Sequence, residues 1–274
     1  MVRIGTAGWT IPPPLASHAP GSGSHLERYA GILHCAEINS SFHRSHRLST
    51  WTRWAASTPP AFRFSAKLPK AITHVAKLVV ESSAFDSFVA ETTALSERLG
   101  AVLVQLPPSL AFEDCPAVEF FEALRERFPE TNLALEPRHR SWFARDADAL
   151  LHQHRIARVA ADPLRDPRLA AGALPTCGGW PGFAYYRLHG SPRMYYSSYE
   201  PGYLARLAAV LREQAAAHDT WVIFDNTAAG QAFGDALVLA HHLQEQEKST
   251  PATGPQKPRR GPRKPTRDAT PAGD

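Results

Sequence analysis

The sequence predicts an α/β protein that folds as a single TIM-type (β/α)8 barrel. Two observations lead to this class. Eight short runs of β type recur along the chain, and most of the gaps between them carry a helical pattern. The chain also has 274 residues, of which 43% are hydrophobic; this suits one large barrel domain. A doubly wound open sheet is the alternative, and no glycine-rich phosphate motif follows any strand to favour it.

The predicted strands are short and rich in Val, Ile, Leu and aromatic residues, as strands buried in a parallel sheet should be. They span 2–8, 36–42, 62–68, 101–107, 132–138, 156–162, 183–190 and 221–226.

Helical spacing of apolar residues marks several connections between these strands. The segment 115–127 has Pro116 in its first turn and Asp114 as its expected N-cap. Further helices are predicted over 83–99, 201–217 and 232–246. By contrast, residues 163–182 are too rich in Pro and Gly for a full helix, so the sixth crossover is expected to be irregular.

Cysteine usage and hydropathy predict a cytoplasmic protein. The three cysteines form no CxxC pair, so neither a disulfide framework nor a cysteine zinc site is indicated. No apolar run approaches the roughly 20 residues that span a bilayer, and the N-terminus carries no secretory pattern. We therefore expect no membrane partner, and the oligomeric state stays open.

The net charge of +4 resides in the C-terminal segment 249–274, which has six basic and two acidic residues. The preceding residues 1–248 have 24 of each sign, so the predicted barrel domain is neutral. The segment has almost no apolar residue, which predicts a disordered basic, Pro-rich tail. It is either a solubilising tail or a weak electrostatic arm for nucleic acid.

Seven motifs occur in the order typical of one family. They are IGTAGWT, EINSSFHR, FRFSAKLPKAITH, LGAVLVQLPPSL, LALEPRHRSW, YYRLHG with YYSSY, and WVIFDNTAAGQAFGDAL, within residues 2–243. The chain thus resembles the family called domain of unknown function 72, the YecE-like proteins. The resemblance implies a TIM-type barrel and implies no particular reaction. This sequence departs from the family pattern at His43, Pro137, Ser197 and Asp225, next to candidate site positions.

Polar residues gather where the predicted strands end, and this is the end that carries the active site in TIM barrels. In YYRLHG, Tyr185, Arg187 and His189 share one face of a strand, and we expect the last two to enter the mouth and meet carboxylates there. We assign Glu136, His189 and Asp225 as catalytic acid and base groups. The candidate substrate-binding residues are Glu37, Asn39, Lys67, Gln105, Arg138, Trp142, Arg187, Tyr195, Tyr199 and Asn226.

These residue types predict an enzyme that acts on an anionic substrate, such as a phosphorylated sugar or a nucleotide, by acid–base chemistry. Lys67 and Arg187 would bind the anion. No cofactor is predicted; a divalent metal on Glu136, Asp162, His189 and Asp225 is the weaker alternative, since no HExxH-type spacing occurs. The alternative function is nucleic-acid binding or processing by the basic tail and an aromatic rim. The rim consists of Trp9, Phe42, Trp142, Tyr195 and Tyr199.

Arg187 has a second interpretation without chemistry. Instead of binding an anion, it would neutralise Glu136 or Asp225 in a closed ion-pair network inside the barrel.

The tail prediction is testable by truncation. Removing residues 249–274 should leave the melting temperature nearly unchanged, because the segment has no apolar side chains that could dock on the barrel. Thermal denaturation of both chains measures this, and a drop of several degrees in the truncated chain would contradict it.

Overall fold

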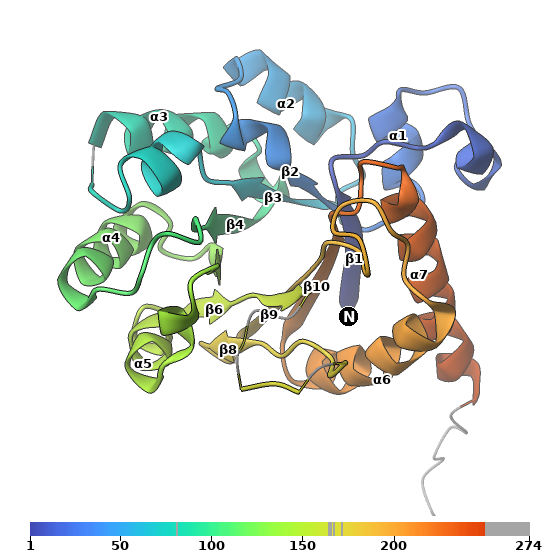
Figure 1. Ribbon diagram of the computed structural model, residues 1–274. Coiled ribbons are helices and arrows are strands. Elements are labelled where there is room, and N and C mark those ends of the chain that lie inside the picture. Colours follow the sequence, from blue (N-terminus) through green and yellow to red (C-terminus); the bar gives the residue numbers. More distant parts are fainter. Residues whose placement is uncertain (81, 164–165, 167, 171, 250–274) are drawn as a thin grey trace, which may run out of the picture.

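The computed structural model describes residues 1–80, 82–163, 166, 168–170 and 172–249. In it a ring of strands is surrounded by helices (Figure 1). The sheet order is β7-β9-β10-β1-β2-β3-β4-β5-β6-β8, and every pair is parallel except β6 with β8. The predicted barrel is therefore confirmed. Of the predicted tail, residues 250–274 lie outside the described residues.

All eight predicted strands form. They are β1 (Val2–Ala7), β2 (Cys35–Ile38), β3 (Arg63–Lys67), β4 (Leu99–Gln105), β5 (Asn132–Glu136), β6 with β7 (Ile156–Arg158 and Ala160–Asp162), β9 (Phe183–Leu188) and β10 (Asp219–Phe224). Several end earlier than predicted, because the backbone turns into a loop or a short helix as soon as the strand reaches the mouth.

The helices lie outside the ring; α1 to α6 connect consecutive strands, and α7 follows the last strand. The α-helices are α1 (His25–Ala30), α2 (Leu48–Ala56), α3 (Ser82–Thr93), α4 (Asp114–Arg127), α5 (Arg145–Gln153), α6 (Pro201–Ala217) and α7 (Gln231–Ser249). Short helical turns are η1 (Pro13–His18), η2 (Asn39–Phe42), η3 (Ala71–Val75), η4 (Ser96–Arg98) and η5 (Arg140–Phe143). One expected detail is wrong: Asp114 is the first residue of α4, and Glu113 precedes it without a side-chain cap.

The sixth strand closes the barrel by changing partners at Val159. Its first half, β6, pairs with β5, and its second half, β7, pairs with β9. At the change, the Val159 N–H still donates to the Leu135 carbonyl at 2.8 Å. Because β6 and β7 are the same stretch of chain, the two ends of the sheet meet there.

The sixth crossover is irregular, as predicted. Its described residues contain no helix and one two-residue strand, β8 (Gly178–Gly179). The strand β8 pairs antiparallel with Ala157 and Arg158 of β6, so it covers the edge that β6 leaves free after the change of partner.

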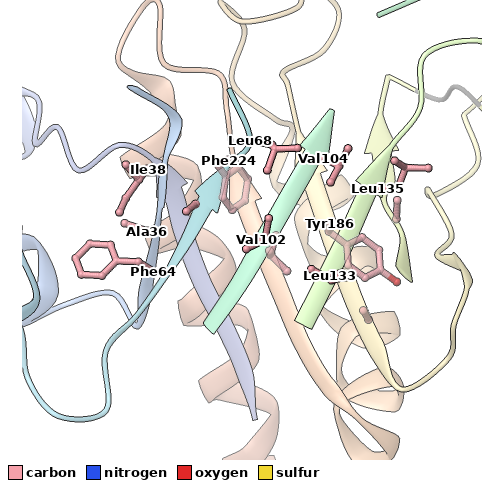
Figure 2. Packing of buried hydrophobic residues seen from close by; sticks show 14 of the residues in the cluster. Ala36, Ile38, Phe64, Leu68, Val102, Val104, Leu133, Leu135, Tyr186 and Phe224 are labelled. Atoms are coloured by element: carbon pink, nitrogen blue, oxygen red, sulfur yellow. The ribbon is translucent and has the colours of Figure 1, made fainter. Parts of the chain in front are cut away.

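Alternation along the strands separates two apolar layers. Outward residues such as Ile38, Phe64, Val102 and Leu133 pack in the layer beneath the helices (Figure 2). Inward residues form a second, smaller cluster inside the ring. It contains Cys35, Ala101, Leu103, Ala134, Ala157, Val159, Ala161, Phe183, Tyr185, Trp221 and Ile223. Small residues on β4, β5 and β6 leave room for the aromatic rings from β9 and β10.

Close packing inside the ring makes a glycine necessary at position 5. A Cβ there would lie 2.1 Å from the carbonyl oxygen of Cys35, which is far inside van der Waals contact. At Gly202 in α6, by contrast, an added Cβ would lie 3.9 Å from its nearest neighbour, in Arg206.

Gly5→Ala should therefore lower stability by at least the 1–3 kcal/mol typical of overpacking, roughly 2–10 °C in melting temperature for a chain of this size. Gly202→Ala, the matched control, should leave it unchanged or slightly raised. Equal melting temperatures for the two variants would contradict the packing argument.

Candidate functional site

The inward face of the sheet becomes charged at the mouth of the barrel. Inward positions on β2, β5 and β9 end in Glu37, Glu136 and Arg187, all with 0% exposure. The residue that follows β10 in the same alternation is Asp225, and Lys67 ends β3. The alternation that places apolar residues inside the ring thus places ionised groups one layer above them.

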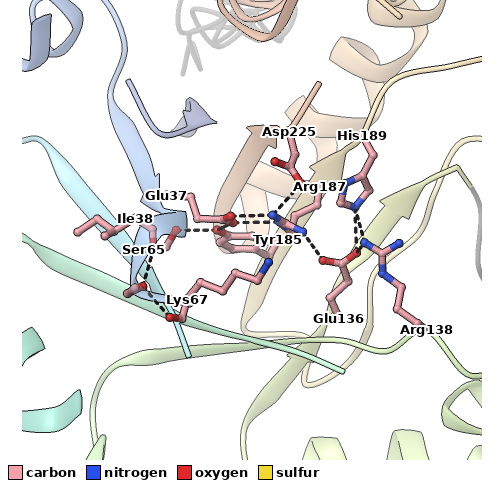
Figure 3. Close-up of polar contacts among 11 residues, drawn as sticks. Glu37, Ile38, Ser65, Lys67, Glu136, Arg138, Tyr185, Arg187, His189 and Asp225 are labelled. Atoms are coloured by element: carbon pink, nitrogen blue, oxygen red, sulfur yellow. Dashed lines mark hydrogen bonds and ion pairs between the residues drawn. The ribbon is translucent and has the colours of Figure 1, made fainter. Parts of the chain in front are cut away.

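The Arg187 guanidinium lies at the centre of this layer and contacts three carboxylates (Figure 3). Its Nε donates to Glu37 Oε2 at 3.0 Å, and its Nη2 donates to Glu37 Oε1 at 2.7 Å. Its Nη1 donates to Glu136 Oε2 at 2.5 Å, and its Nη2 also lies 3.1 Å from Asp225 Oδ2. These are the contacts that the ion-pair interpretation of Arg187 requires.

His189 connects two of these carboxylates. Its Nδ1 lies 3.0 Å from Asp225 Oδ2, and its Nε2 lies 2.9 Å from Glu136 Oε1. Arg138 Nη2 reaches the same Glu136 oxygen at 2.6 Å and the His189 Nε2 at 3.2 Å. The three candidate catalytic residues therefore form one chain, Asp225–His189–Glu136, with Arg138 at its end.

A hydroxyl pair supports the cluster from below. The Tyr185 hydroxyl donates to Glu37 Oε2 at 3.1 Å and lies 2.7 Å from Ser65 Oγ. We did not assign either residue to the site, although both share the inward alternation with Arg187 and Lys67. The shared face was the signal that could have found them.

The charges in the cluster hold each other ionised. Burial alone would raise the pKa of Glu136, but Arg187, His189 and Arg138 hold it well below its usual range. Burial likewise opposes a lowered pKa at Asp225, and Arg187, His189 and Lys67 outweigh it. Arg187 is buried too, yet Glu37, Glu136 and Asp225 raise its pKa well above the usual value.

Lys67 differs from the two arginines. In the described part of the chain its Nζ forms no ion pair or hydrogen bond, and it lies 4.2 Å from the centre of the Phe42 ring. Figure 3 shows its side chain extending toward Arg187. Burial, and then the positive charge of Arg187, lower the pKa of Lys67 to about 8, although Glu37, Glu136 and Asp225 act in the opposite direction.

Only the outer members of the cluster reach solvent. The side chains of Arg138 and Asp225 are 9% and 8% exposed, and Lys67 is 6% exposed. A pocket of about 270 Å³ adjoins the Lys67 contact through Phe42. It is lined by Ser41, Phe42, His43, Arg44, Ser45, Pro69, Lys70, Ala71, Ala84, Ser87, Phe88 and Glu91, and Phe42 is the residue it shares with the Lys67 contact.

Several predicted binding residues lie elsewhere. Trp142 is fully buried between Phe112 and Phe121, outside the ring. Asn226 follows Asp225 directly, so it points to the opposite face of the chain, where its Nδ2 donates to Asp235 at 2.7 Å. We carry neither residue into the proposed site.

The remaining predicted residues surround the cluster without joining it. Tyr199 is buried, and its hydroxyl donates to Asp162 Oδ2 at 2.8 Å. Tyr195 is 38% exposed, and the centre of its ring lies 5.5 Å from the centre of the His189 ring. Asn39 and Gln105 are half-buried beyond β2 and at the end of β4, and the Asn39 Oδ1 atom is buried without a hydrogen-bond partner.

The geometry bears on the metal alternative. Among the described residues, no group of three or more His, Cys, Asp or Glu side chains is arranged to hold a metal ion. The Arg187 guanidinium occupies the space between Glu37, Glu136 and Asp225, and Asp162 is turned away toward Tyr199.

Comparison with known proteins identifies the family. The family model described as "Protein of unknown function DUF72" matches residues 3–261. The chain belongs to the DUF72 family. A curated relative, the UPF0759 protein YecE of Escherichia coli K12, is 29% identical over 168 residues, and this match covers 59% of each chain. The chain thus spans about three fifths of the length of that relative.

Solved DUF72 structures have the same fold. A DUF72 protein from Thermotoga maritima superposes with a TM-score of 0.71 and 27% identity over 89% of this chain and 99% of the other. One from Enterococcus faecalis gives a TM-score of 0.72 with 19% identity over 89% and 96%. Within the part of this DUF72 chain that the structure describes, no helix is long and apolar enough to cross a membrane.

The ion-pair network predicts a large stability effect at position 187. Arg187→Ala would leave three buried carboxylates without their shared counter-charge, a change that typically costs about 3–5 kcal/mol. Arg187→Lys should cost less, because it keeps the charge and loses the bidentate contact with Glu37. Denaturant titration measures both.

Arg53→Ala is the matched control, since Arg53 is exposed on α2, and it should change stability by less than about 0.5 kcal/mol. A loss at Arg187→Ala no larger than this control would show that the network contributes little to folding.

Proposed function

We propose that this DUF72 chain is an enzyme that acts on a small anionic substrate by acid–base chemistry at the C-terminal mouth of the barrel. The observation that carries the proposal is the Asp225–His189–Glu136 chain, whose outer carboxylate, Asp225, reaches solvent and lies within the electrostatic influence of Arg187 and Lys67. Titratable groups with shifted pKa values in a mouth of this kind are typical of active sites.

The substrate anion is bound by Lys67 and Arg138 in this proposal. Arg187 would be the stronger anion ligand by chemistry, but its 0% exposure and three carboxylate partners leave it no access. Among the described residues, Lys67 has no carboxylate partner and Arg138 pairs with Glu136 alone. The buried Nε of Arg138 also has no partner there. A substrate phosphate or carboxylate would supply the missing acceptors.

Asp225 exchanges the proton with the substrate. It is the catalytic carboxylate with exposed surface, and its lowered pKa keeps it ionised as a base at neutral pH. His189 fixes its orientation and Glu136 fixes His189, as expected for a base held by a second and a third group.

The nucleic-acid alternative loses part of its basis. Trp142 and Tyr199 of the expected aromatic rim are buried, and the basic tail lies outside the described residues.

Thermal shift with inorganic phosphate and a panel of phosphorylated and carboxylated small molecules tests the proposal. A ligand at a hundredfold excess over its dissociation constant stabilises the native state by about 2.7 kcal/mol, roughly 5–10 °C here. Arg138→Gln should remove the shift, whereas the exposed control Arg53→Gln should keep it. Asp225→Asn should still bind the anion, because one repelling charge is gone.

The shift should also depend on pH with a defined sign. Lys67 is positively charged below its pKa of about 8 and neutral above it, so anion binding should weaken as the pH rises through that value. No shift with any anion, or a shift that survives Arg138→Gln unchanged, would overturn the anion site.

A further inference from the structure

We propose that the Lys67 amine is a nucleophile that forms a Schiff base with the carbonyl group of a small anionic substrate. This rests on the proposed function, because it uses the same mouth and the same anion. It adds the covalent step and the substrate class, an aldehyde or ketone that carries a carboxylate or a phosphate.

The first argument is that Lys67 lacks the contacts of a structural lysine. A buried ammonium without a partner is costly, and a lysine retained only for stability would form an ion pair with one of the carboxylates. Glu37 and Glu136 lie in the same layer but are directed at Arg187. Within the described residues the Lys67 Nζ meets the Phe42 ring instead.

The second argument is the availability of the free amine. Only a neutral amine has the lone pair that attacks a carbonyl, and enzymes obtain it by burying the lysine and placing another cation near it. Both conditions hold here, since Lys67 is 6% exposed and the Arg187 guanidinium is close enough to repel its charge. The lowered pKa of Lys67, about 8, brings the neutral amine within reach near neutral pH.

The covalent step balances with the groups present. The Lys67 nitrogen bonds to the carbonyl carbon, the C=O π pair becomes a hydroxyl as it takes a proton, and the nitrogen loses a proton, which gives a carbinolamine. A second proton converts the hydroxyl to water, which leaves as the C=N bond forms. Asp225, which lies 3.0 Å from His189, takes the proton from the nitrogen and passes it to the oxygen. The second proton comes from solvent at the exposed edge of the mouth, and the iminium keeps the resulting positive charge.

The iminium then withdraws electrons from the neighbouring carbon, so that Asp225 can remove a proton from it. No oxidant, reductant or metal takes part in either stage.

The pocket that shares Phe42 with the Lys67 contact would suit a small substrate. Its volume of about 270 Å³ lies below the 300–1,000 Å³ of sites for drug-sized ligands. Arg44 and Lys70 line it, so a substrate whose anionic group reached past Phe42 would meet positive charge there as well as at Arg138.

Reductive trapping in the full-length chain tests the proposal. Dihydroxyacetone phosphate and pyruvate are incubated with the protein at pH 8 in the presence of cyanoborohydride, which reduces an imine to a stable amine, and the adduct is located by peptide mass spectrometry. We expect an adduct on Lys67 at least tenfold more abundant than on Lys77, an exposed lysine of the same chain. The uncharged analogues dihydroxyacetone and acetone should give less than a tenth of it.

Lys67→Arg separates this proposal from the one it rests on. Arginine keeps the positive charge but has no nucleophilic amine, so the variant should lose the adduct, while the phosphate-induced thermal shift is measured on the unaltered chain. Lys77→Arg should keep the adduct. The thermal melting of each variant without ligand reports whether it folds. If Lys67→Arg does not fold, peptide mapping of the unaltered chain still shows whether the adduct lies on Lys67.

Equal labelling of Lys67 and Lys77, or no adduct on Lys67 with either anionic probe, would overturn the Schiff-base proposal. If phosphate still raises the melting temperature in that case, the anion site stands without it. If phosphate and the anion panel have no effect on the unaltered chain, the proposed function itself fails.

Discussion

The interaction between Arg187 and its three carboxylates is the constraint on which the mouth of the barrel depends. Glu37 and Glu136 come from β2 and β5, which are not neighbours of β9 in the sheet. The contacts therefore cross the interior and exist only when the sheet has closed. Closure in turn depends on the change of partner between β6 and β7 at Val159. The Arg187 contacts therefore need this irregular strand, and they in turn hold the closed sheet together. Removing a guanidinium from water costs free energy, and its ion pairs offset that cost only where the geometry is good. The closed barrel supplies this geometry by bringing three carboxylates around Arg187.

The contacts with Arg187 determine which of the neighbouring charged side chains remain free to bind a ligand. Glu37 is fully occupied by Arg187 and Tyr185. Glu136 is shared among Arg187, Arg138 and His189. The groups with capacity left are at the outer edge, where Asp225, Arg138 and Lys67 each keep some exposed surface. The network thus separates an inner set of charges that hold the barrel from an outer set that can meet a ligand.

Much of this arrangement follows from alternation along the strands. The eight strands, the irregular sixth crossover and the inward direction of Arg187 and His189 were predictable, because a period of two decides the face of each residue. The same rule excludes Asn226, which follows Asp225 and must face away. The prediction that Trp142 lies at the mouth was wrong. Its distance along the chain from a strand end does not reveal whether a loop aromatic turns toward the mouth or into the core. The pairing of each carboxylate with a particular guanidinium depends on the width of the barrel and the stagger of its strands. No local pattern in the sequence reveals either quantity.

Lys67 and Arg187 illustrate why residue type alone could not assign their roles. Both are cations on inward positions at the mouth, and chemistry would favour the arginine as the anion ligand. The structure gives Arg187 three carboxylates and gives the Lys67 Nζ an aromatic ring. The same three carboxylates stabilise the charged form of each, yet the pKa of Arg187 rises and that of Lys67 falls. Direct contact outweighs desolvation at Arg187, whereas burial beside a cation dominates at Lys67. A strongly paired guanidinium thus creates, at its own outer side, the conditions under which a lysine can act as a free amine.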